Sequence, residues 1–201
     1  MSPHSFASKV RRRLLHIACR LVQWPRILLY RLLSSAGIQG KPILYQPLQT
    51  AGMGVIEFVG QIKIGFSPSP LFFSTYAYME ARNSGARITI GDGTWINNGF
   101  SAIAEHTSIT IGQRVLIGAN VEILDSDFHG IRVVDRNVSR SDWARPVVIE
   151  DDVFIGSNAR VLKGVTIGRG AVIANSSIVV SDIPADSVAG GNPARVIKVI
   201  G

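Results

Sequence analysis

Hydrophobic positions recur every six residues through the C-terminal half of the chain. Aliphatic residues hold this spacing without a miss, and small or branched residues recur four positions after them. The aliphatic positions are Ile149, Ile155, Val161, Ile167, Ile173 and Val179. A helix would show spacings of three and four, and an amphipathic strand would alternate in twos. A period of six predicts one short strand plus one tight turn, with three such units in each coil and stacked coils around a continuous apolar core.

The same rule holds in earlier, shorter blocks. One block runs through Ile111, Ile117 and Ile123, and another begins at Ile90 and Ile96 before its phase slips. Between residues 64 and 90 the pattern is too irregular to assign coils. Six consecutive matches make chance enrichment of aliphatics in an ordinary β protein improbable. We therefore predict an all-β solenoid, a parallel β-helix over residues 41–201, with a C-terminal cap at about 184–201.

One interruption separates the two best blocks. The rule places the next inward aliphatic at position 129, where His129 stands, and the register resumes only at Ile149. This predicts an extruded loop over about 125–147. Histidine exchanges its proton near neutral pH, and Asp127 could orient its ring, which favours a general base. The alternative is a polar loop histidine hydrogen-bonded to Asp127. Glu105 and His106, at the earlier phase slip, form a weaker candidate pair.

Charge is concentrated at the N-terminus. Residues 1–33 hold seven Lys and Arg and no acid, whereas the remaining 14 Lys and Arg equal the 14 Asp and Glu of the chain. The body is therefore neutral, and nucleic acid is not a predicted partner. Charges interrupt every apolar run, so neither a spanning helix nor a signal peptide is predicted. We expect residues 1–40 to form a basic amphipathic segment of two short helices, separated near Pro25, that either contacts an anionic membrane or caps the solenoid.

Cysteine usage limits the remaining chemistry. Cys19 is the single cysteine, and no Cys and His cluster has the spacing of metal ligands. We therefore expect a reducing, cytoplasmic setting and no bound metal.

Three stretches resemble a known family. These are residues 149–156, residues 161–168 and the Gly-Asn-Pro-Ala-Arg run within residues 189–198. They are similar to the C-terminal signature of the hexapeptide-repeat acetyltransferases, which include maltose, galactoside and nodulation-factor enzymes and those that decorate colanic acid and O-antigen. The resemblance implies a left-handed β-helix, a homotrimer with active sites between subunits, and acetyl-CoA as acyl donor.

The resemblance also implies roles for particular residues. His129 matches the catalytic histidine, and we take Asp127 as its partner. Expected contacts to the acceptor sugar are Asn97, Asn98, Glu105 and Asp125. Expected contacts to the coenzyme are Phe154, Ser157, Asn175, Arg195 and Lys198. Phe154 replaces a frequent tryptophan and Asn175 a frequent alanine, which are departures from the family pattern.

The predicted function is transfer of an acetyl group from acetyl-CoA to a sugar hydroxyl, in synthesis of a bacterial exopolysaccharide, capsule or O-antigen. The acceptor is expected to be a sugar or polysaccharide precursor carried on lipid, which would suit an enzyme resting on the cytoplasmic face of the inner membrane. One alternative is N-acetylation of an amino sugar nucleotide. Another is a catalytically silent trimeric scaffold. Hydration at a three-histidine metal site is disfavoured, because the four histidines are scattered.

Overall fold

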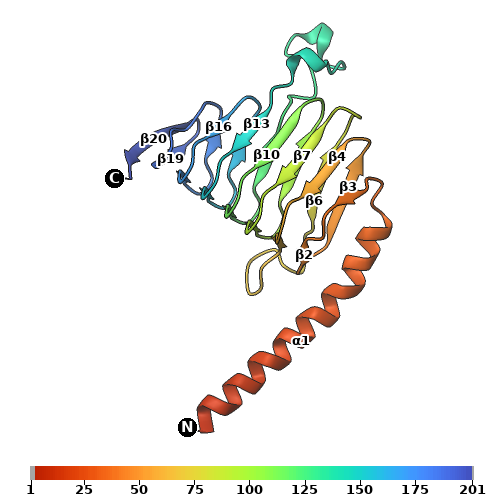
Figure 1. Ribbon diagram of the computed structural model, residues 1–201, viewed down its shortest axis with the longest axis vertical. Helices are drawn as coiled ribbons and strands as arrows, with labels where there is room; N and C mark the ends of the chain where they lie inside the picture. Colours follow the sequence, from red (N-terminus) through yellow and green to blue (C-terminus); the bar gives the residue numbers. More distant parts are fainter. Residues whose placement is uncertain (1–2, 201) are drawn as a thin grey trace.

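The chain folds into three long sheets, parallel except for the last pair of strands, preceded by one helix (Figure 1). The computed structural model describes residues 3–200, and side chains are described for residues 10, 11, 13–15 and 17–200. Sheet A contains β1 (Ile38–Gln39), β4 (Val55–Phe58), β7 (Arg87–Ile90), β10 (Ser108–Ile111), β13 (Val147–Ile149) and β16 (Thr166–Ile167). Sheet B contains β2 (Ile43–Leu44), β5 (Lys63–Ile64), β8 (Trp95–Ile96), β11 (Leu116–Ile117), β14 (Phe154–Ile155), β17 (Val172–Ile173), β19 (Ser187–Gly191) and β20 (Ala194–Val199). Sheet C contains β3 (Leu48–Gly52), β6 (Ala77–Ala81), β9 (Ser101–Ala104), β12 (Glu122–Leu124), β15 (Arg160–Val161) and β18 (Ile178–Val179).

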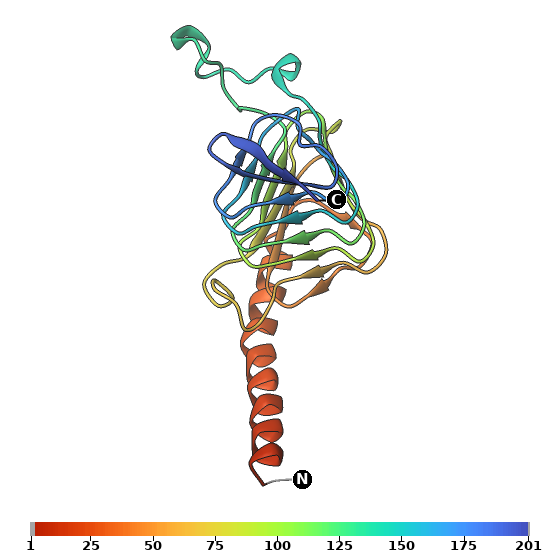
Figure 2. The same ribbon diagram turned by 90° about the vertical axis from the view of Figure 1, so that its left-hand side faces the viewer.

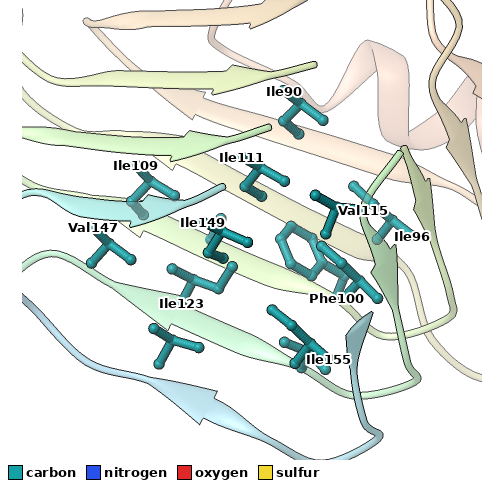
Figure 3. Close-up of a cluster of buried hydrophobic side chains, with 14 of the residues drawn as sticks. Ile90, Ile96, Phe100, Ile109, Ile111, Val115, Ile123, Val147, Ile149 and Ile155 are labelled. Carbon is teal, nitrogen blue, oxygen red and sulfur yellow. The ribbon is translucent and has the colours of Figure 1, made fainter. Parts of the chain in front are cut away.

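Each coil takes one strand from each sheet in turn, so the chain winds around a three-sided core (Figure 2). The six-residue rule is confirmed in the register, since Ile111 pairs with Ile149 and Ile149 with Ile167. All three are buried, and Ile111 and Ile149 point into the space between the sheets (Figure 3). The coils begin earlier than the sequence pattern could show, at β1, because insertions and polar inward residues such as Gln46 blur the period there.

Glycine directly after the aliphatic allows neighbouring coils to stack. A Cβ on Gly118 would stand 2.5 Å from the backbone nitrogen of Ser157, and one on Gly156 would stand 2.6 Å from that of Asn175. Such contacts are too short for any side chain. Absence of a side chain at this position therefore sets the spacing of coils at the corner between sheets B and C, the B–C corner.

Two insertions interrupt the winding. The first insertion, residues 65–76, joins β5 to β6 at the B–C corner. The second insertion, residues 125–146, joins β12 to β13 at the corner between sheets C and A, the C–A corner, and contains two short 3-10 helices, η1 (Val133–Asp135) and η2 (Ser141–Trp143). The second insertion and the N-terminal helix project from opposite ends of the molecule in both views (Figures 1 and 2).

The N-terminal segment is a single helix, α1 (Pro3–Leu32), so the prediction of two short helices is wrong. Pro25 lies inside it and removes one backbone hydrogen bond, at a cost of about 3 kcal/mol. Contacts on either side of the proline hold the helix against the body. Gln23 donates to the carbonyl of Phe72 at 2.5 Å, and Arg26 donates to the carbonyl of Thr75 at 2.8 Å. No helix in the described part of the chain is long and apolar enough to cross a membrane.

Candidate active site

The C–A corner begins with a buried carboxylate. Asp125, the first residue after β12, is fully buried and accepts the backbone N–H groups of Glu105, His106 and Thr107 at 2.7, 3.1 and 2.7 Å. It also accepts the Thr107 hydroxyl at 3.0 Å. Its two oxygens therefore fix the turn of the preceding coil. Because the side chain is buried, it cannot contact a sugar within this protomer.

His129 is exposed at the mouth of a hollow of about 380 Å³. The hollow lies between the root of the second insertion and the next coil, and its walls include Asp127, Trp143, Arg145 and Lys163. The His129 Nδ1 atom lies 3.3 Å from the Gly130 carbonyl oxygen. A neutral imidazole that donates Nδ1–H to this carbonyl keeps the Nε2 lone pair free. The geometry therefore suits a general base.

Asp127 is engaged by a lysine. Its Oδ2 accepts a hydrogen bond from Lys163 Nζ at 2.5 Å, and the same ammonium donates to the Trp143 carbonyl at 2.9 Å. The partner of His129 in the structure is thus the Gly130 carbonyl, and Asp127, which we expected to pair with His129, binds Lys163 instead. Sequence reasoning did not assign Lys163 a role. The signal was its register, since the pairing of Ile123 with Val161 carries Lys163 to the position directly above Asp125.

Glu105 fastens the second insertion to the solenoid. Its side chain is 5% exposed, accepts the Ser139 hydroxyl at 2.8 Å, and lies 3.2 Å from the Arg82 guanidinium. Burial by itself raises the pKa of the Glu105 carboxyl, but hydrogen bonds from Ser126 and Ser139 and the charge of Arg82 outweigh it. The pKa therefore lies below its usual value, and the carboxylate is charged at neutral pH.

Arg82 extends this network. Its guanidinium lies 2.8 Å from the Glu80 carboxylate and stacks over the Phe128 ring, with its central carbon 4.9 Å from the ring centre. The cation thereby links the coil below to the residue that precedes His129. His106 is turned away, with Nδ1 3.1 Å from the Asn83 amide nitrogen and Nε2 buried. It does not line the hollow beside His129.

The two predicted asparagines lie at the B–C corner, away from the second insertion. Asn98 is fully buried and supports the first insertion: Oδ1 accepts the Phe66 N–H at 3.0 Å, and Nδ2 donates to the carbonyls of Phe66 and Pro70, both at 2.9 Å. Asn97 accepts the N–H of Asn98 at 2.7 Å and lines a second, apolar hollow. Within one protomer these residues are not brought together with His129.

The apolar hollow runs over sheet B. It measures about 220 Å³, and Phe66, Trp95, Leu116 and Phe154 form its walls. Leu116 and Phe154 are 51% and 44% exposed, so the hollow offers an apolar surface open to solvent. Ser157 and Asn175 follow at the same B–C corner and bind successive coils, since the Ser157 N–H donates to Asn175 Oδ1 at 2.9 Å. Four residues predicted to contact the acceptor or the coenzyme thus lie on the same side of the solenoid. They are Asn97, Phe154, Ser157 and Asn175.

Arg195 and Lys198 lie on β20, which pairs antiparallel with β19 and extends sheet B. The predicted coenzyme residues therefore follow sheet B and its corner, whereas His129, Asp127, Glu105 and Asp125 gather at the C–A corner. Among the described side chains, no group of three or more His, Cys, Asp and Glu could hold a metal ion.

Comparison with known proteins identifies the family of this chain. Residues 146–180 match the family model described as bacterial transferase hexapeptide (six repeats), and residues 108–136 match the hexapeptide repeat of succinyl-transferase. YJL218W of Saccharomyces cerevisiae, provisionally named an acetyltransferase, is 36% identical over 72% of this chain and 68% of its own length. The chain belongs to the hexapeptide-repeat acetyltransferase family.

Solved structures and a further sequence relative also resemble the chain. The Vibrio cholerae acetyltransferase VCA0836, in complex with acetyl coenzyme A, is 38% identical over 58% of this chain and 61% of that one, with a TM-score of 0.52. The polySia-specific acetyltransferase NeuO is 28% identical over 80% and 73%, with a TM-score of 0.57. A Staphylococcus aureus tetrahydropyridine-dicarboxylate N-acetyltransferase is 46% identical, but the chain spans only 31% of its length.

Proposed function

We propose that this enzyme transfers the acetyl group of acetyl-CoA to a sugar hydroxyl, with His129 as general base. The observation that carries the proposal is the His129 ring, which is exposed at a hollow bordered by charged side chains, with Nδ1 facing the Gly130 carbonyl and Nε2 free. Such an arrangement can accept a hydroxyl proton at neutral pH, a contribution of typically about 10² to 10⁴ in rate.

Acetyl-CoA is the acyl donor of this acetyltransferase, and the residues present on sheet B fit its chemistry. The apolar hollow bordered by Leu116 and Phe154 suits the uncharged pantetheine arm, and the basic Arg195 and Lys198 continue the same sheet toward phosphate groups. We propose Phe154, Ser157, Asn175, Arg195 and Lys198 as its contacts. Ser157 and Asn175 already join successive coils, so their contacts would use the remaining atoms.

When bound, acetyl-CoA supplies an acetyl thioester whose carbon–sulfur bond breaks as the carbon–oxygen bond to the acceptor forms. His129 Nε2 would take the proton of the attacking hydroxyl, and the Gly130 carbonyl would hold Nδ1–H as the ring becomes charged. The same Nε2 would then return the proton to the departing sulfur. Lys163 and Asp127 would keep the wall of the hollow in place as positioning residues.

We infer that the active site forms between copies of the chain. His129 lies at the C–A corner, whereas Asn97 and the proposed coenzyme residues lie on sheet B and the B–C corner. A second copy that sets its sheet B beside the second insertion would unite the two sets. We propose a homotrimer of left-handed β-helices, which supplies three such contacts, with Asn97 and Glu105 next to the acceptor.

We further propose a bacterial surface polysaccharide as acceptor, with the enzyme held peripherally at the cytoplasmic face of the inner membrane. The likeness to a polySia-specific acetyltransferase and to galactoside acetyltransferase, at 28% and 29% identity, supports a carbohydrate hydroxyl. The second candidate is an amine acceptor, favoured by the 46% identity with an N-acetyltransferase over 81 residues. A silent scaffold is the remaining alternative, and absence of acetyl-CoA binding would favour it.

The test measures coenzyme A release by purified protein with polysaccharide, monosaccharide and amino sugar nucleotide acceptors. We expect polysaccharide to be preferred and His129→Ala to lower turnover by about a hundredfold or more while the fold stays intact. Ser139→Ala, in the same insertion, serves as a control for loosening of the loop without loss of the base. Near-normal turnover in His129→Ala would remove the histidine from the mechanism, and preference for an amine would replace the hydroxyl acceptor.

A further inference from the structure

Helix α1 uses its more polar side to bind the body of its own chain. Cys19 Sγ lies 3.9 Å from the Ser67 hydroxyl, and the Tyr30 ring packs on Tyr76 with ring centres 4.5 Å apart. Gln23, between them on the same side, is 1% exposed. Intervals of four and seven residues keep these three positions on one face of the helix. The first insertion is therefore the surface against which α1 packs.

The opposite face of α1 carries large aliphatic side chains that the described structure leaves largely exposed, although Leu21 also borders a hollow between the helix and the body. Leu14, Leu21, Leu28 and Leu32 follow one another at helical spacing along its centre, and Leu21 and Leu32 are 69% and 75% exposed. Further exposed residues widen this apolar face on both sides. They are Val22 and Leu29 on one side and Ile17 and Trp24 on the other, where the last two also line a hollow that Leu44 and Phe72 of the body share. A globular protein ordinarily turns such a face inward, so its outward direction requires an explanation.

Charge identifies what can cover the apolar face. Exposed Arg13, Arg20 and Arg31 flank it along one side, and residues 1–33 contain no acidic residue to neutralise them. Pairing this helix with the same helix of another copy would bring seven cations of each segment together without a counter-charge. An anionic surface meets both requirements, because it offers an apolar interior for the leucines and negative headgroups for the arginines.

We propose that α1 lies in the plane of an anionic lipid bilayer, with the leucine face in the acyl boundary and Trp24, 68% exposed at the edge of that face, at the headgroup level. The helix would bind without crossing the bilayer. Because the second insertion projects from the end of the molecule opposite α1, His129 would be held away from the lipid (Figures 1 and 2). An acceptor attached to lipid would then need a glycan long enough to extend beyond the bilayer surface.

The test is cosedimentation of the full chain with vesicles of phosphatidylcholine, with and without phosphatidylglycerol. We expect binding only to the phosphatidylglycerol vesicles, and weaker binding as salt is raised. Leu21→Glu/Leu28→Glu should weaken it by about tenfold or more. The matched control, Met53→Glu/Val59→Glu, places the same two charges at exposed apolar positions of the body and should bind as the parent chain does.

Tryptophan fluorescence gives a second readout. A blue shift on addition of phosphatidylglycerol vesicles, lost in Trp24→Phe, is the expected result. The proposal is overturned if the parent chain ignores these vesicles, or if Leu21→Glu/Leu28→Glu changes the oligomeric state in light scattering, which would assign the face to another copy of the chain. Turnover on a soluble acceptor should be unchanged in all of these variants, so failure here leaves the proposed reaction untouched.

Discussion

The two insertions leave the same solenoid at different corners and are held in different ways. The first, at the B–C corner, is fastened to the solenoid by an uncharged group, the Asn98 amide, which binds Phe66 and Pro70, while Arg26 of α1 adds one contact to the Thr75 carbonyl. The second, at the C–A corner, is fastened by charged groups, with Lys163 on Asp127 and Glu105 on Ser139. The first supports a helix, and the second surrounds a histidine.

This difference shows how two insertions in one repetitive fold can serve different roles. Neutral, buried hydrogen bonds make a platform whose strength changes little with pH or salt. Charged contacts at a half-open corner also fix a loop, but they place an electric field around the group that they hold. We therefore expect damage to the first insertion to lower stability, and damage to the second to lower catalysis.

The largest expected effect on stability is at Asn98. Asn98→Ala removes three hydrogen bonds to backbone groups of the first insertion. We expect the free energy of unfolding to fall by about 2 kcal/mol, and Tm by roughly 4–8 °C. Thermal unfolding followed by circular dichroism measures both.

The control is Asn175→Ala at the same corner, where one exposed side chain accepts a single hydrogen bond. It should change the free energy of unfolding by about 0.5 kcal/mol at most. Turnover of Asn98→Ala at saturating substrate should stay within about twofold of the parent enzyme. A large loss of turnover without a loss of stability would make Asn98 a substrate contact, and the contrast between the two insertions would fail.

Lys163 provides the corresponding test of the second insertion. Lys163→Met keeps the length of the side chain but frees Asp127 and the Trp143 carbonyl. Because His129 shares a hollow with these groups, we expect kcat/KM to fall by about tenfold, while the free energy of unfolding falls by about 1 kcal/mol. Steady-state kinetics and thermal unfolding together separate the two effects.

Arg160→Met is the matched control for Lys163→Met. Arg160 lies in the same coil and forms an exposed ion pair with Glu122 at 3.1 Å, but it does not line the hollow beside His129. Its kcat/KM should therefore match the parent enzyme. Equal losses in the two variants would mean that any charge removed from this coil disturbs turnover, which would deprive Lys163 of a specific positioning role.

Prediction from sequence succeeded where the repeat is regular. Ile149, Ile155 and Val161 each sit in a turn-and-strand unit whose neighbours are fixed by the period alone, so register and core follow from the spacing. The first coils could not be phased, because the first insertion and inward residues such as Gln46 interrupt the aliphatic series. Pro25 misled the prediction for the N-terminal segment, since the helix continues through the proline and Gln23 and Arg26 on either side of it contact the body.

The candidate site shows the same limit. His129 stood out because it occupies the place of an inward aliphatic at the point where the register breaks. The register places Lys163 at this corner, through the pairing of Ile123 with Val161. Its contact with Asp127 and the contact of Ser139 with Glu105 could not be deduced, because Asp127 and Ser139 lie within the insertion. Side chains that meet across coils depend on the path of an irregular loop, and a period of six contains no information about that path.

The smallest expected effect concerns Glu105 and pH. Its pKa is lowered in the folded protein, so its charged form contributes stability that is complete above its ordinary value of about 4.5 and is lost as the pH falls through the lowered value. Glu105→Gln lacks this contribution at every pH. At neutral pH the variant should be less stable than the parent enzyme by about 1 kcal/mol or less, and the difference should shrink on acidification below the ordinary value. Thermal unfolding over a pH series measures it, with Glu57→Gln, in an exposed pair with Arg87 at 3.2 Å, as the control. If the gap between the parent enzyme and Glu105→Gln were constant down to strong acid, the carboxylate would hold the second insertion by shape alone. The distinction between a charged and a neutral fastening would then not apply to this contact.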